Sequence, residues 1–174
     1  AISSRKIESA NDFAQKHHFN KAYVSYESML CDEQVDLVYV ATPHNLHFEN
    51  TMLALDHGKH VLCEKPFGVN SNEVEQMIAS AREKKLFLME AMWSRFLPHI
   101  QQIKALISQG EIGPIKLLRS DFNMYPPFSA ESRLFNKSLI GGSLMDIGIY
   151  PVFLALYILG EPKRIQAMAG IGAT

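Results

Sequence analysis

The chain has 174 residues, of which 47% are hydrophobic and 20% are charged, and its formal net charge is -1. This composition is typical of a soluble globular protein with one or two modest domains, and it argues against disorder. The Lys and Arg residues are scattered along the chain. We therefore expect neither nucleic acid nor a charged membrane surface as a partner.

Signals for membrane insertion, secretion and metal binding are weak. The longest apolar run, around Val152 to Leu159, is shorter than a bilayer span requires, and the stretch AISSRKIESAND has no apolar signal-peptide core. Cys31 and Cys63 lack metal-ligand spacing and are too few for a disulfide framework. We expect a cytoplasmic protein without a metal site, in which both cysteines are buried thiols.

The first residues, Ala1 and Ile2, are typical of the end of a strand. A helix is predicted next, with an apolar face formed by Ile7, Ala10, Phe13 and Ala14. No G-x-G-x-x-G stretch precedes it, although in a doubly wound dinucleotide-binding fold that loop follows the central first strand. We infer that roughly 30 residues, comprising one strand, the loop and one helix, are missing from the N-terminus.

Apolar runs then alternate with amphipathic segments, which favours βαβ units around a parallel sheet. The three predicted strands are VDLVYVATP, KHVLCEKP and KLFLMEAMW, and the first of them is apolar enough to be covered on both faces. HNLHFENTMLALDHG is a predicted helix that ends near Gly58. A second predicted helix, NSNEVEQMIASAREKK, starts with Ser71 as its N-cap, and its apolar stripe is Val74, Met77, Ile78 and Ala81.

The pattern changes in the second half of the chain. A predicted helix, PHIQQIKALISQGEIG, ends at Gly110 and Gly113, PIKLLRSDFNMYP alternates loosely, and a long helix is predicted from Ser143 to Leu159. KRIQAMAGI is interpreted as a further strand. The predicted fold class is α/β: an incomplete Rossmann-type doubly wound parallel sheet over residues 1–94, lacking its first βα unit, followed by the beginning of an α+β domain over residues 95–174.

Hydroxyl and basic side chains follow the predicted first strand. NAD-binding folds usually place an acidic residue there for the ribose 2′-hydroxyl, whereas this chain has Ser3-Ser4-Arg5-Lys6. Ser4 and Arg5 could bind a 2′-phosphate through charge-assisted hydrogen bonds, which favours NADP, with NAD as the alternative cofactor. A simpler interpretation is that these residues only cap the helix.

The stretch ATPHNLH follows a buried strand. The carboxyl ends of parallel strands are where such sheets bind ligands, and the next helix offers free backbone N–H groups there. Thr42, Pro43, Leu46 and His47 are therefore candidate cofactor-binding residues. The alternative is an ordinary turn between a strand and a helix, with a surface His.

Two segments carry the candidate catalytic residues. Lys65 lies in EKP at the end of a predicted strand, while Asp146 and Tyr150 are four apart in GGSLMDIGIYP and share a helix face. The glycine pair before that helix permits close approach of a ligand. On spacing alone, the second segment is equally consistent with a capped core helix whose Tyr makes one hydrogen bond.

Taken together, CEKPFGVN, EAMWSRFLP and GGSLMDIGIYP resemble, in this order and spacing, the Gfo/Idh/MocA oxidoreductase family, and within it the dihydrodiol dehydrogenase branch. The resemblance covers essentially the whole chain. Members are about twice as long, which implies that the C-terminal part of the sheet domain is missing as well. Members of this branch also oxidise D-xylose with NADP, and full-length members form homodimers through the sheet domain.

The resemblance assigns roles to residues of this sequence. Lys65 matches the family's active-site lysine and Asp146 its aspartate, while Tyr150 stands where most members have His and where this branch has its acid/base. Glu64 and Lys65 match positions at the cofactor edge. Trp93 and Phe122 match aromatic residues of the substrate pocket, although ordinary core packing is an equal alternative.

These roles imply hydride transfer between NADP and a carbinol carbon of a trans-dihydrodiol or an aldose such as D-xylose, with Tyr150 taking the hydroxyl proton. A free tyrosine has a pKa of about 10, and a neighbouring lysine ammonium stabilises the phenolate. Two alternatives remain: a sugar or inositol dehydrogenase of the same family, and a non-catalytic nicotinamide-binding regulatory protein. We also expect the 174-residue chain to fold poorly when it is expressed alone.

Overall fold

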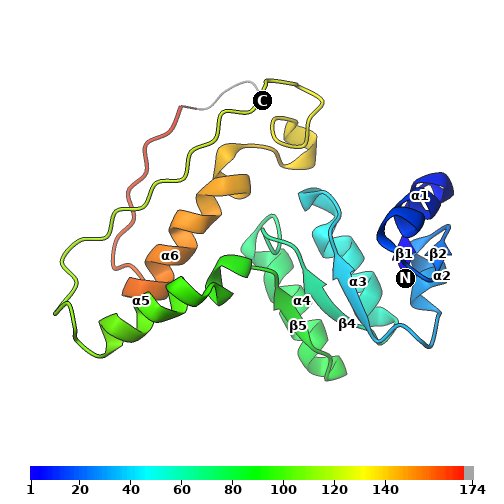
Figure 1. The fold of residues 1–174 in the computed structure, drawn as a ribbon, viewed down its shortest axis with the longest axis horizontal. Helices are drawn as coiled ribbons and strands as arrows, with labels where there is room; N and C mark the ends of the chain where they lie inside the picture. Colours follow the sequence, from blue (N-terminus) through cyan, green and yellow to red (C-terminus); the bar gives the residue numbers. More distant parts are fainter. Residues whose placement is uncertain (171–174) are drawn as a thin grey trace. The chain divides into compact units, whose positions relative to one another are not determined.

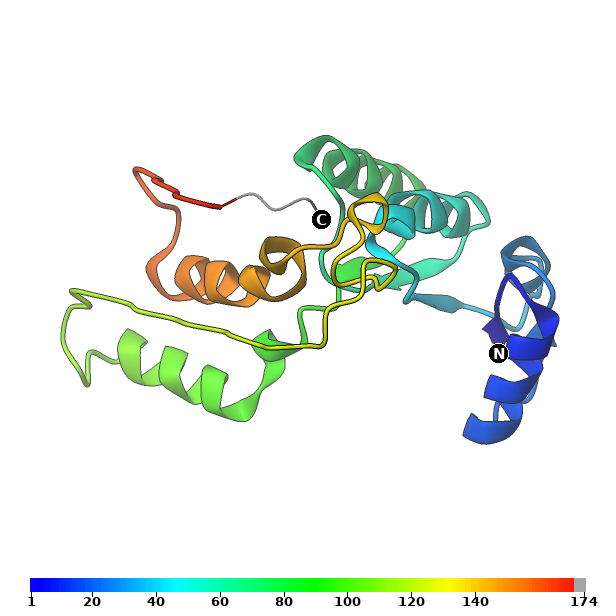
Figure 2. The same cartoon turned by 90° about the horizontal axis from the view of Figure 1, so that it is seen from above.

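The computed structural model describes residues 1–170, which form two compact units. The first unit contains residues 1–42 and 46–90, and the second contains residues 43–45 together with the chain from Ala91 onward. Parallel strands and helices alternate through the first unit, whereas the second is built from helices and extended segments (Figures 1 and 2). The predicted α/β class is confirmed.

Two parallel sheets make up the strand layer of the first unit. β1 (Ile2–Ser3) pairs with β2 (Ala22–Tyr23), and a second sheet has the order β3 (Leu37–Val40), β4 (His60–Cys63), β5 (Leu88–Glu90). In this second sheet Val40 is level with Cys63, and Cys63 is level with Glu90. The segments that follow these three strands therefore leave the sheet at one common edge.

Among residues 1–170 no backbone ladder joins the β1–β2 sheet to the β3–β4–β5 sheet. In a doubly wound sheet the strands at the positions of β1 and β3 flank the central first strand, which is followed by the glycine loop. The missing N-terminal βα unit stays a prediction, and the strand pairing of the described residues is compatible with it.

Two helices of the first unit, α2 (Tyr26–Leu30) and α4 (Ser71–Lys84), begin where a short polar side chain satisfies a free N–H group. The Asn70 side chain accepts a hydrogen bond from the Glu73 backbone N–H at 3.0 Å, so the predicted N-cap at Ser71 is wrong by one residue. The Glu73 carboxylate in turn accepts from the Val69 N–H at 3.0 Å. The α-helices of the first unit are α1 (Ile7–His17), α2 (Tyr26–Leu30), α3 (His47–Asp56) and α4 (Ser71–Lys84). The 3-10 turn η1 (His44–Leu46) precedes α3, and its first two residues belong to the second unit.

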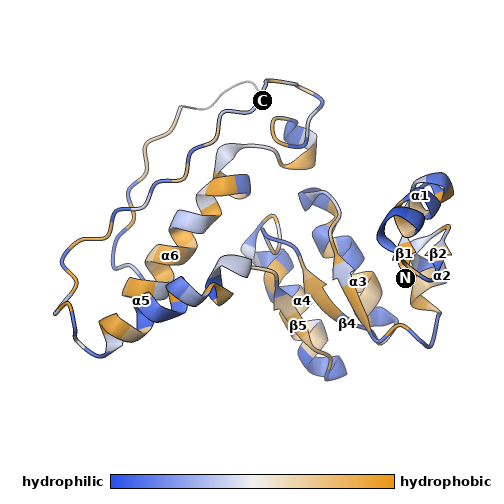
Figure 3. Cartoon of the chain, in the orientation of Figure 1, coloured by the Kyte–Doolittle hydropathy of each residue, from blue (hydrophilic) through white to orange (hydrophobic). Residues whose placement is uncertain are grey.

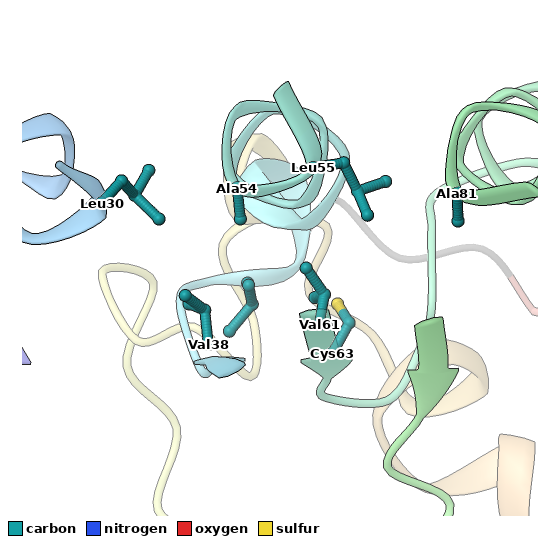
Figure 4. Close-up of a cluster of buried hydrophobic side chains, with 8 residues drawn as sticks. Leu30, Val38, Ala54, Leu55, Val61, Cys63 and Ala81 are labelled. Carbon is teal, nitrogen blue, oxygen red and sulfur yellow. The ribbon is translucent and has the colours of Figure 1, made fainter. Parts of the chain in front are cut away.

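The core of the first unit lies between the β3–β4–β5 sheet and the helices on one of its faces. Figure 4 shows the valines of β3 and β4 pointing toward α3, with α4 alongside. The buried cluster consists of Leu30, Val38, Val40, Ala54, Leu55, Val61, Cys63 and Ala81. Burying apolar surface stabilises a fold by about 25 cal/mol per Å². The burial of this cluster is therefore the main contribution that holds the sheet edge in place.

Two expectations about burial are corrected by the structure. β3 was predicted to be covered on both faces, but Leu37 is 49% exposed and Tyr39 is 53% exposed, because α3 and α4 pack on the other face. Cys63 is buried as predicted, whereas Cys31 is exposed, because it lies at the C-cap of α2 just beyond the buried Leu30.

The second unit is organised around two helices that contact each other. The Lys104 ammonium of α5 (Pro98–Ser108) donates to the Tyr157 carbonyl of α6 (Ile149–Leu159) at 2.6 Å. As predicted, Gly110 and Gly113 follow α5, and both have positive φ. The predicted helix from Ser143 to Leu159 is present, but its first part is a π-helix, η4 (Leu144–Gly148). Two 3-10 turns, η2 (Trp93–Phe96) and η3 (Lys137–Leu139), complete the unit.

The predicted late strand, KRIQAMAGI, is not formed in residues 163–170, and Ile171 lies outside the described residues. The loosely alternating segment at residues 114–126 also contains no strand. A strand requires a hydrogen-bonded neighbour, and these segments have none within residues 1–170. Their large side chains are consequently exposed, as at Leu117 (84%) and Tyr125 (100%).

One segment of 23 residues, Lys137–Leu159, is long and apolar enough by length and composition to cross a membrane, and a window of 18 residues within it has a mean hydropathy of 1.7. This segment contains the apolar run around Val152 to Leu159 and extends well beyond it on the N-terminal side. Figure 3 shows the hydrophobic colouring of α6 within this segment. Ile140 and Gly142 interrupt it with positive φ, and Asp146 within it is buried. Core helices of soluble proteins pass the same test, so this is weak evidence for a membrane span.

Candidate active site

The turn that carries Lys65 continues directly from β4. The Glu64 N–H donates to the Val40 carbonyl at 2.9 Å, which extends the β3–β4 pairing by one residue. The Glu64 carboxylate then accepts from the Lys65 N–H at 3.0 Å and from the Tyr39 hydroxyl. The Lys65–Pro66 peptide bond is cis. The backbone that leads into Lys65 is therefore held by hydrogen bonds on the β3 side of the turn.

His47, the first residue of α3, connects this turn to the end of β3. Its ring is fully buried, with Nδ1 at 2.7 Å from the Pro66 carbonyl oxygen and Nε2 at 2.9 Å from the Thr42 carbonyl oxygen. The ordinary-turn interpretation placed a His on the surface here, and that is wrong. Because its ring nitrogens face these two backbone oxygens, His47 holds the turn after β4 and the end of β3 together from within the protein.

Glu90, at the end of β5, holds the same turn from the other side. Its Oε1 accepts from the Phe67 N–H at 2.9 Å. Burial raises the pKa of the Glu90 carboxyl, and the Phe67 hydrogen bond partly opposes that rise. Burial and the adjacent Glu64 carboxylate likewise raise the pKa of Tyr39 to about 12. Tyr39 is therefore a hydroxyl near neutral pH and donates its hydrogen bond to Glu64.

The candidate cofactor residues after β3 fall into two sets. In the first unit, the Thr42 hydroxyl accepts from the Asn50 side-chain amide at 3.1 Å, and Leu46 is the N-cap of α3. Pro43 groups with the second unit, as does the buried His44, whose Nδ1 lies 3.4 Å from the Ile140 carbonyl oxygen. Contact of any of these residues with a cofactor stays a prediction.

The Ser3–Lys6 segment precedes α1 but does not cap it. Lys6 is the N-cap position, no side chain hydrogen-bonds there, and the Ser3 hydroxyl donates instead to the Tyr23 carbonyl at 3.5 Å. The alternative in which these residues serve only as helix caps is therefore not supported. Ser4 is half-buried, while Arg5 and Lys6 are exposed beside the uncapped helix start. These donors fit the charge and hydrogen-bonding needs of a nucleotide phosphate.

In the second unit an aromatic group surrounds the Tyr150 hydroxyl. The Trp93 indole N–H donates to the Tyr150 hydroxyl oxygen at 2.9 Å, and the two rings meet edge-on with centroids 5.9 Å apart. The Phe122 ring lies 5.3 Å from the Tyr150 ring. Trp93 is 54% exposed and Phe122 is 45% exposed, so neither has the burial that core packing would give it.

Asp146 is buried in the π-helix η4 and forms an ion pair. The Arg133 guanidinium donates from Nη1 to Oδ1 of Asp146 at 3.0 Å. Sequence reasoning missed Arg133, because it lies in a segment without periodicity. The general requirement that a buried carboxylate be paired could have prompted a search for a cation, but it would not have selected this one.

The predicted site residues thus fall into two groups. The first unit brings together the turn of Lys65, the end of β3 at Thr42, and His47; the second brings together Tyr150, Trp93 and Phe122. The convergence of Lys65 with Asp146 and Tyr150 stays a prediction. No group of three or more His, Cys, Asp or Glu side chains that could hold a metal ion occurs within residues 1–170.

Comparison with protein families gives two matches. A model described as an oxidoreductase family with an NAD-binding Rossmann fold matches residues 1–92, and the Gfo/Idh/MocA C-terminal domain model matches residues 100–173. The apolar segment Lys137–Leu159 lies inside the second match.

Curated proteins with similar sequences include several trans-1,2-dihydrobenzene-1,2-diol dehydrogenases. The trans-1,2-dihydrobenzene-1,2-diol dehydrogenase of Xenopus laevis is 43% identical over 169 residues, which are 96% of this chain and 51% of that protein. The Homo sapiens protein of the same name is 40% identical over 173 residues, which are 97% of this chain and 50% of that protein. The chain spans about half the length of the curated relatives it matches.

Two solved structures have a similar fold. KijD10, a 3-ketoreductase from Actinomadura kijaniata in complex with NADP and TDP-benzene, has a TM-score of 0.80 and 32% identity, covering 91% of this chain and 48% of that chain. A levoglucosan dehydrogenase in complex with NADH and levoglucosan has a TM-score of 0.79 and 29% identity, covering 92% and 44%.

Proposed function

Because the chain belongs to the Gfo/Idh/MocA oxidoreductase family, we propose that its protein is an NADP-dependent dehydrogenase acting on a carbinol carbon. The proposed substrate is a trans-dihydrodiol or an aldose such as D-xylose. Relatives 40 to 43% identical are named trans-1,2-dihydrobenzene-1,2-diol dehydrogenase. The observation that carries the proposal is the Tyr150 hydroxyl, which accepts a hydrogen bond from the half-exposed Trp93 indole.

The choice of NADP rests on the segment before α1. The exposed Arg5 and Lys6, next to a helix start without a side-chain cap, offer positive charge and N–H donors to a 2′-phosphate. A carboxylate at this position would repel that phosphate. The similar solved structures hold NADP in one case and NADH in another, so NAD is the alternative. Equilibrium binding of both nucleotides to the full-length protein, with Arg5→Ala as a second sample, tests the choice.

In this proposal the bound nicotinamide ring supplies the hydride acceptor. The Tyr150 phenolate, formed when the hydroxyl releases its proton to solvent, takes the carbinol proton and becomes the hydroxyl again. The Trp93 N–H, which lies 2.9 Å from this oxygen, stabilises the phenolate. Phe122 provides an apolar surface against the Tyr150 ring. Lys65 keeps its predicted role as an ammonium that stabilises the phenolate, and Arg133 fixes the orientation of Asp146.

The test is Tyr150→Phe in the full-length protein, followed by NADPH absorbance with D-xylose and an aromatic trans-dihydrodiol. Loss of a general base typically lowers the rate by about 100- to 10,000-fold. We expect kcat to fall in that range, while the Kd for NADPH changes little, because the mutated residue lies outside the nucleotide-binding unit. Unchanged turnover would remove Tyr150 from the proposed mechanism.

A sugar dehydrogenase is the second candidate. The observation in its favour is that the solved structures with similar folds include a levoglucosan dehydrogenase in complex with levoglucosan. Turnover of cyclic sugars or inositols without turnover of the dihydrodiol would select this candidate. Tight NADPH binding with no turnover of any alcohol or carbonyl compound would instead select the regulatory alternative.

Two further properties belong to the proposal. The full-length protein is a homodimer in solution, which light scattering would measure. It is located in the cytoplasm, in keeping with the sequence expectation, and cell fractionation would test this.

A further inference from the structure

His47 connects three segments of the first unit with one buried ring. It is the first residue of α3, and its two nitrogens reach the carbonyl that follows β3 and the carbonyl that follows β4, at 2.9 and 2.7 Å. The acceptor after β4 belongs to Pro66, the neighbour of Lys65. No part of the ring is exposed to solvent.

We propose that His47 is a positioning residue that fixes the turn of Lys65 against the end of β3. This inference rests on the proposed function, in which Lys65 acts on the reacting groups and the end of β3 binds the nucleotide. His47 itself touches neither substrate nor cofactor in this proposal. It acts through two backbone oxygens.

The geometry explains why the turn needs this contact. β4 is the central strand of its sheet, so the turn after it can be held from both neighbours. Glu90 holds it from β5 through the Phe67 N–H, and His47 holds it from the β3–α3 side through the Pro66 carbonyl. Loss of the His47 contact would release the Pro66 carbonyl, so that on the β3 side only the contacts of Glu64, before Lys65, would still hold the turn.

The chemistry of the contact suggests a test with two partial replacements. A neutral imidazole donates one hydrogen bond and an imidazolium donates two. In His47→Asn the side-chain amide N takes the position of Nδ1 and can still donate to Pro66. In His47→Gln the amide N takes the position of Nε2 and can still donate to Thr42. The two variants therefore separate the contact with the turn of Lys65 from the contact with the end of β3.

The experiment uses the full-length protein with steady-state kinetics at varied NADP+. In His47→Gln we expect kcat to fall on the order of 10- to 100-fold, with the KM for NADP+ nearly unchanged, since small displacements of a catalytic group have effects of that size. In His47→Asn we expect a smaller loss of kcat and a larger rise in the KM for NADP+. His57→Asn is the matched control, because His57 is exposed at the other end of the same helix.

A second readout does not depend on activity. Competitive acetylation followed by mass spectrometry measures the reactivity of the Lys65 amine. We expect this reactivity to change in His47→Gln and to stay close to wild type in His47→Asn and His57→Asn. If the wild type turns over none of the substrates but Lys65 reactivity still changes in His47→Gln alone, the proposed function fails and the positioning role stands.

The proposal would be overturned in favour of a purely structural His if the two His47 variants behaved alike. They would then show equal losses of kcat, equal Lys65 reactivity and equally lowered thermal transition temperatures. If both variants fail to fold, the wild type decides the matter by NMR. A His47 ring N–H that is protected from exchange with solvent supports the donated hydrogen bonds, and a rapidly exchanging one overturns the proposal.

Discussion

At the scale of single residues, the hydrogen bond from Trp93 to Tyr150 can be tested separately from the packing of the two rings. Trp93→Phe keeps an aromatic ring beside Tyr150 but removes the indole donor. We expect kcat to fall roughly 10- to 150-fold, because a hydrogen bond to a charged group contributes about 1.5 to 3 kcal/mol. The measurement is the pH dependence of kcat, since the deficit should shrink at high pH, where the phenolate forms more easily.

The matched control is Phe122→Leu, which changes the packing against Tyr150 without touching a hydrogen bond. We expect this variant to affect the KM for an aromatic substrate while leaving the pH profile in place. A Trp93→Phe profile that superimposes on the wild type after scaling would mean that the indole contributes only shape.

The two cysteines should differ in reactivity. Burial raises the pKa of the Cys63 thiol to about 11, whereas Cys31 is exposed at the end of α2. Since the thiolate is the reactive form, we expect rapid alkylation of Cys31 at pH 8 and very slow alkylation of Cys63 in the folded protein. Peptide mapping after timed iodoacetamide treatment would measure both rates, and equal rates would contradict the buried position of Cys63.

At the residue level, spacing placed Asp146 and Tyr150 on one predicted helix, and the structure has them in the consecutive helical segments η4 and α6. The resemblance added Trp93 and Phe122, which contact Tyr150. The sequence did not indicate Arg133 or Glu90, and it did not indicate the buried contacts of His47. Arg133 and His47 have partners distant in sequence, at Asp146 and Pro66, and no local pattern specifies such pairs.

At the scale of elements, the start of α4 offers a test of helix capping. Asn70→Ala removes the side-chain acceptor for the Glu73 N–H and should lower the free energy of unfolding by about 1 kcal/mol. Ser71→Ala, at the position that the sequence suggested as the cap, should have a much smaller effect. Urea denaturation of the full-length proteins compares the two, and a larger loss for the Ser71 variant would restore the original prediction.

The elements that could be predicted are those that bury an apolar face against a neighbour. The alternation of β3, β4 and β5 with α3 and α4 follows from the sequence, and their parallel pairing is confirmed. The extended segments around residues 114–126 and 163–170 have suitable alternation but no partner strand among the described residues, so propensity alone does not make them strands.

The π-helix η4 could not be foreseen either. Its sequence, LMDIG, fits an α-helical pattern, and only the chain geometry shows the wider turn. Such turns often occur at functional sites. Here the wider turn holds Asp146 just before α6, the helix that carries Tyr150, so the angle between these two side chains differs from that of a regular α-helix.

At the scale of the whole molecule, exposed apolar side chains predict the behaviour of the 174-residue chain alone. Large hydrophobic residues are exposed in both units, among them Leu37, Phe87, Leu117, Tyr125 and Phe128. Apolar surface of this extent is typical of an interaction face or of a protein prone to aggregate. We expect the isolated chain to bind the dye ANS strongly and to unfold without a cooperative transition. A sharp thermal transition that NADPH raises would contradict this.

The whole-molecule prediction from the sequence was right about fold class and family, since both follow from βα alternation and a few ordered motifs. The relation between the nucleotide-binding residues and the Tyr150 group was not accessible, because no sequence pattern fixes how two units are placed. The expectation of a cytoplasmic homodimer also stays a prediction.

The contacts of His47 have a consequence for evolutionary analysis. Both of its acceptors are main-chain oxygens, which exist whatever side chain occupies those two positions. Pairwise covariation among homologous sequences therefore carries no signal for this connection. A statistical map of the family built from substitutions would omit a contact that joins two strand ends, and only coordinates or direct mutation of the His would reveal it.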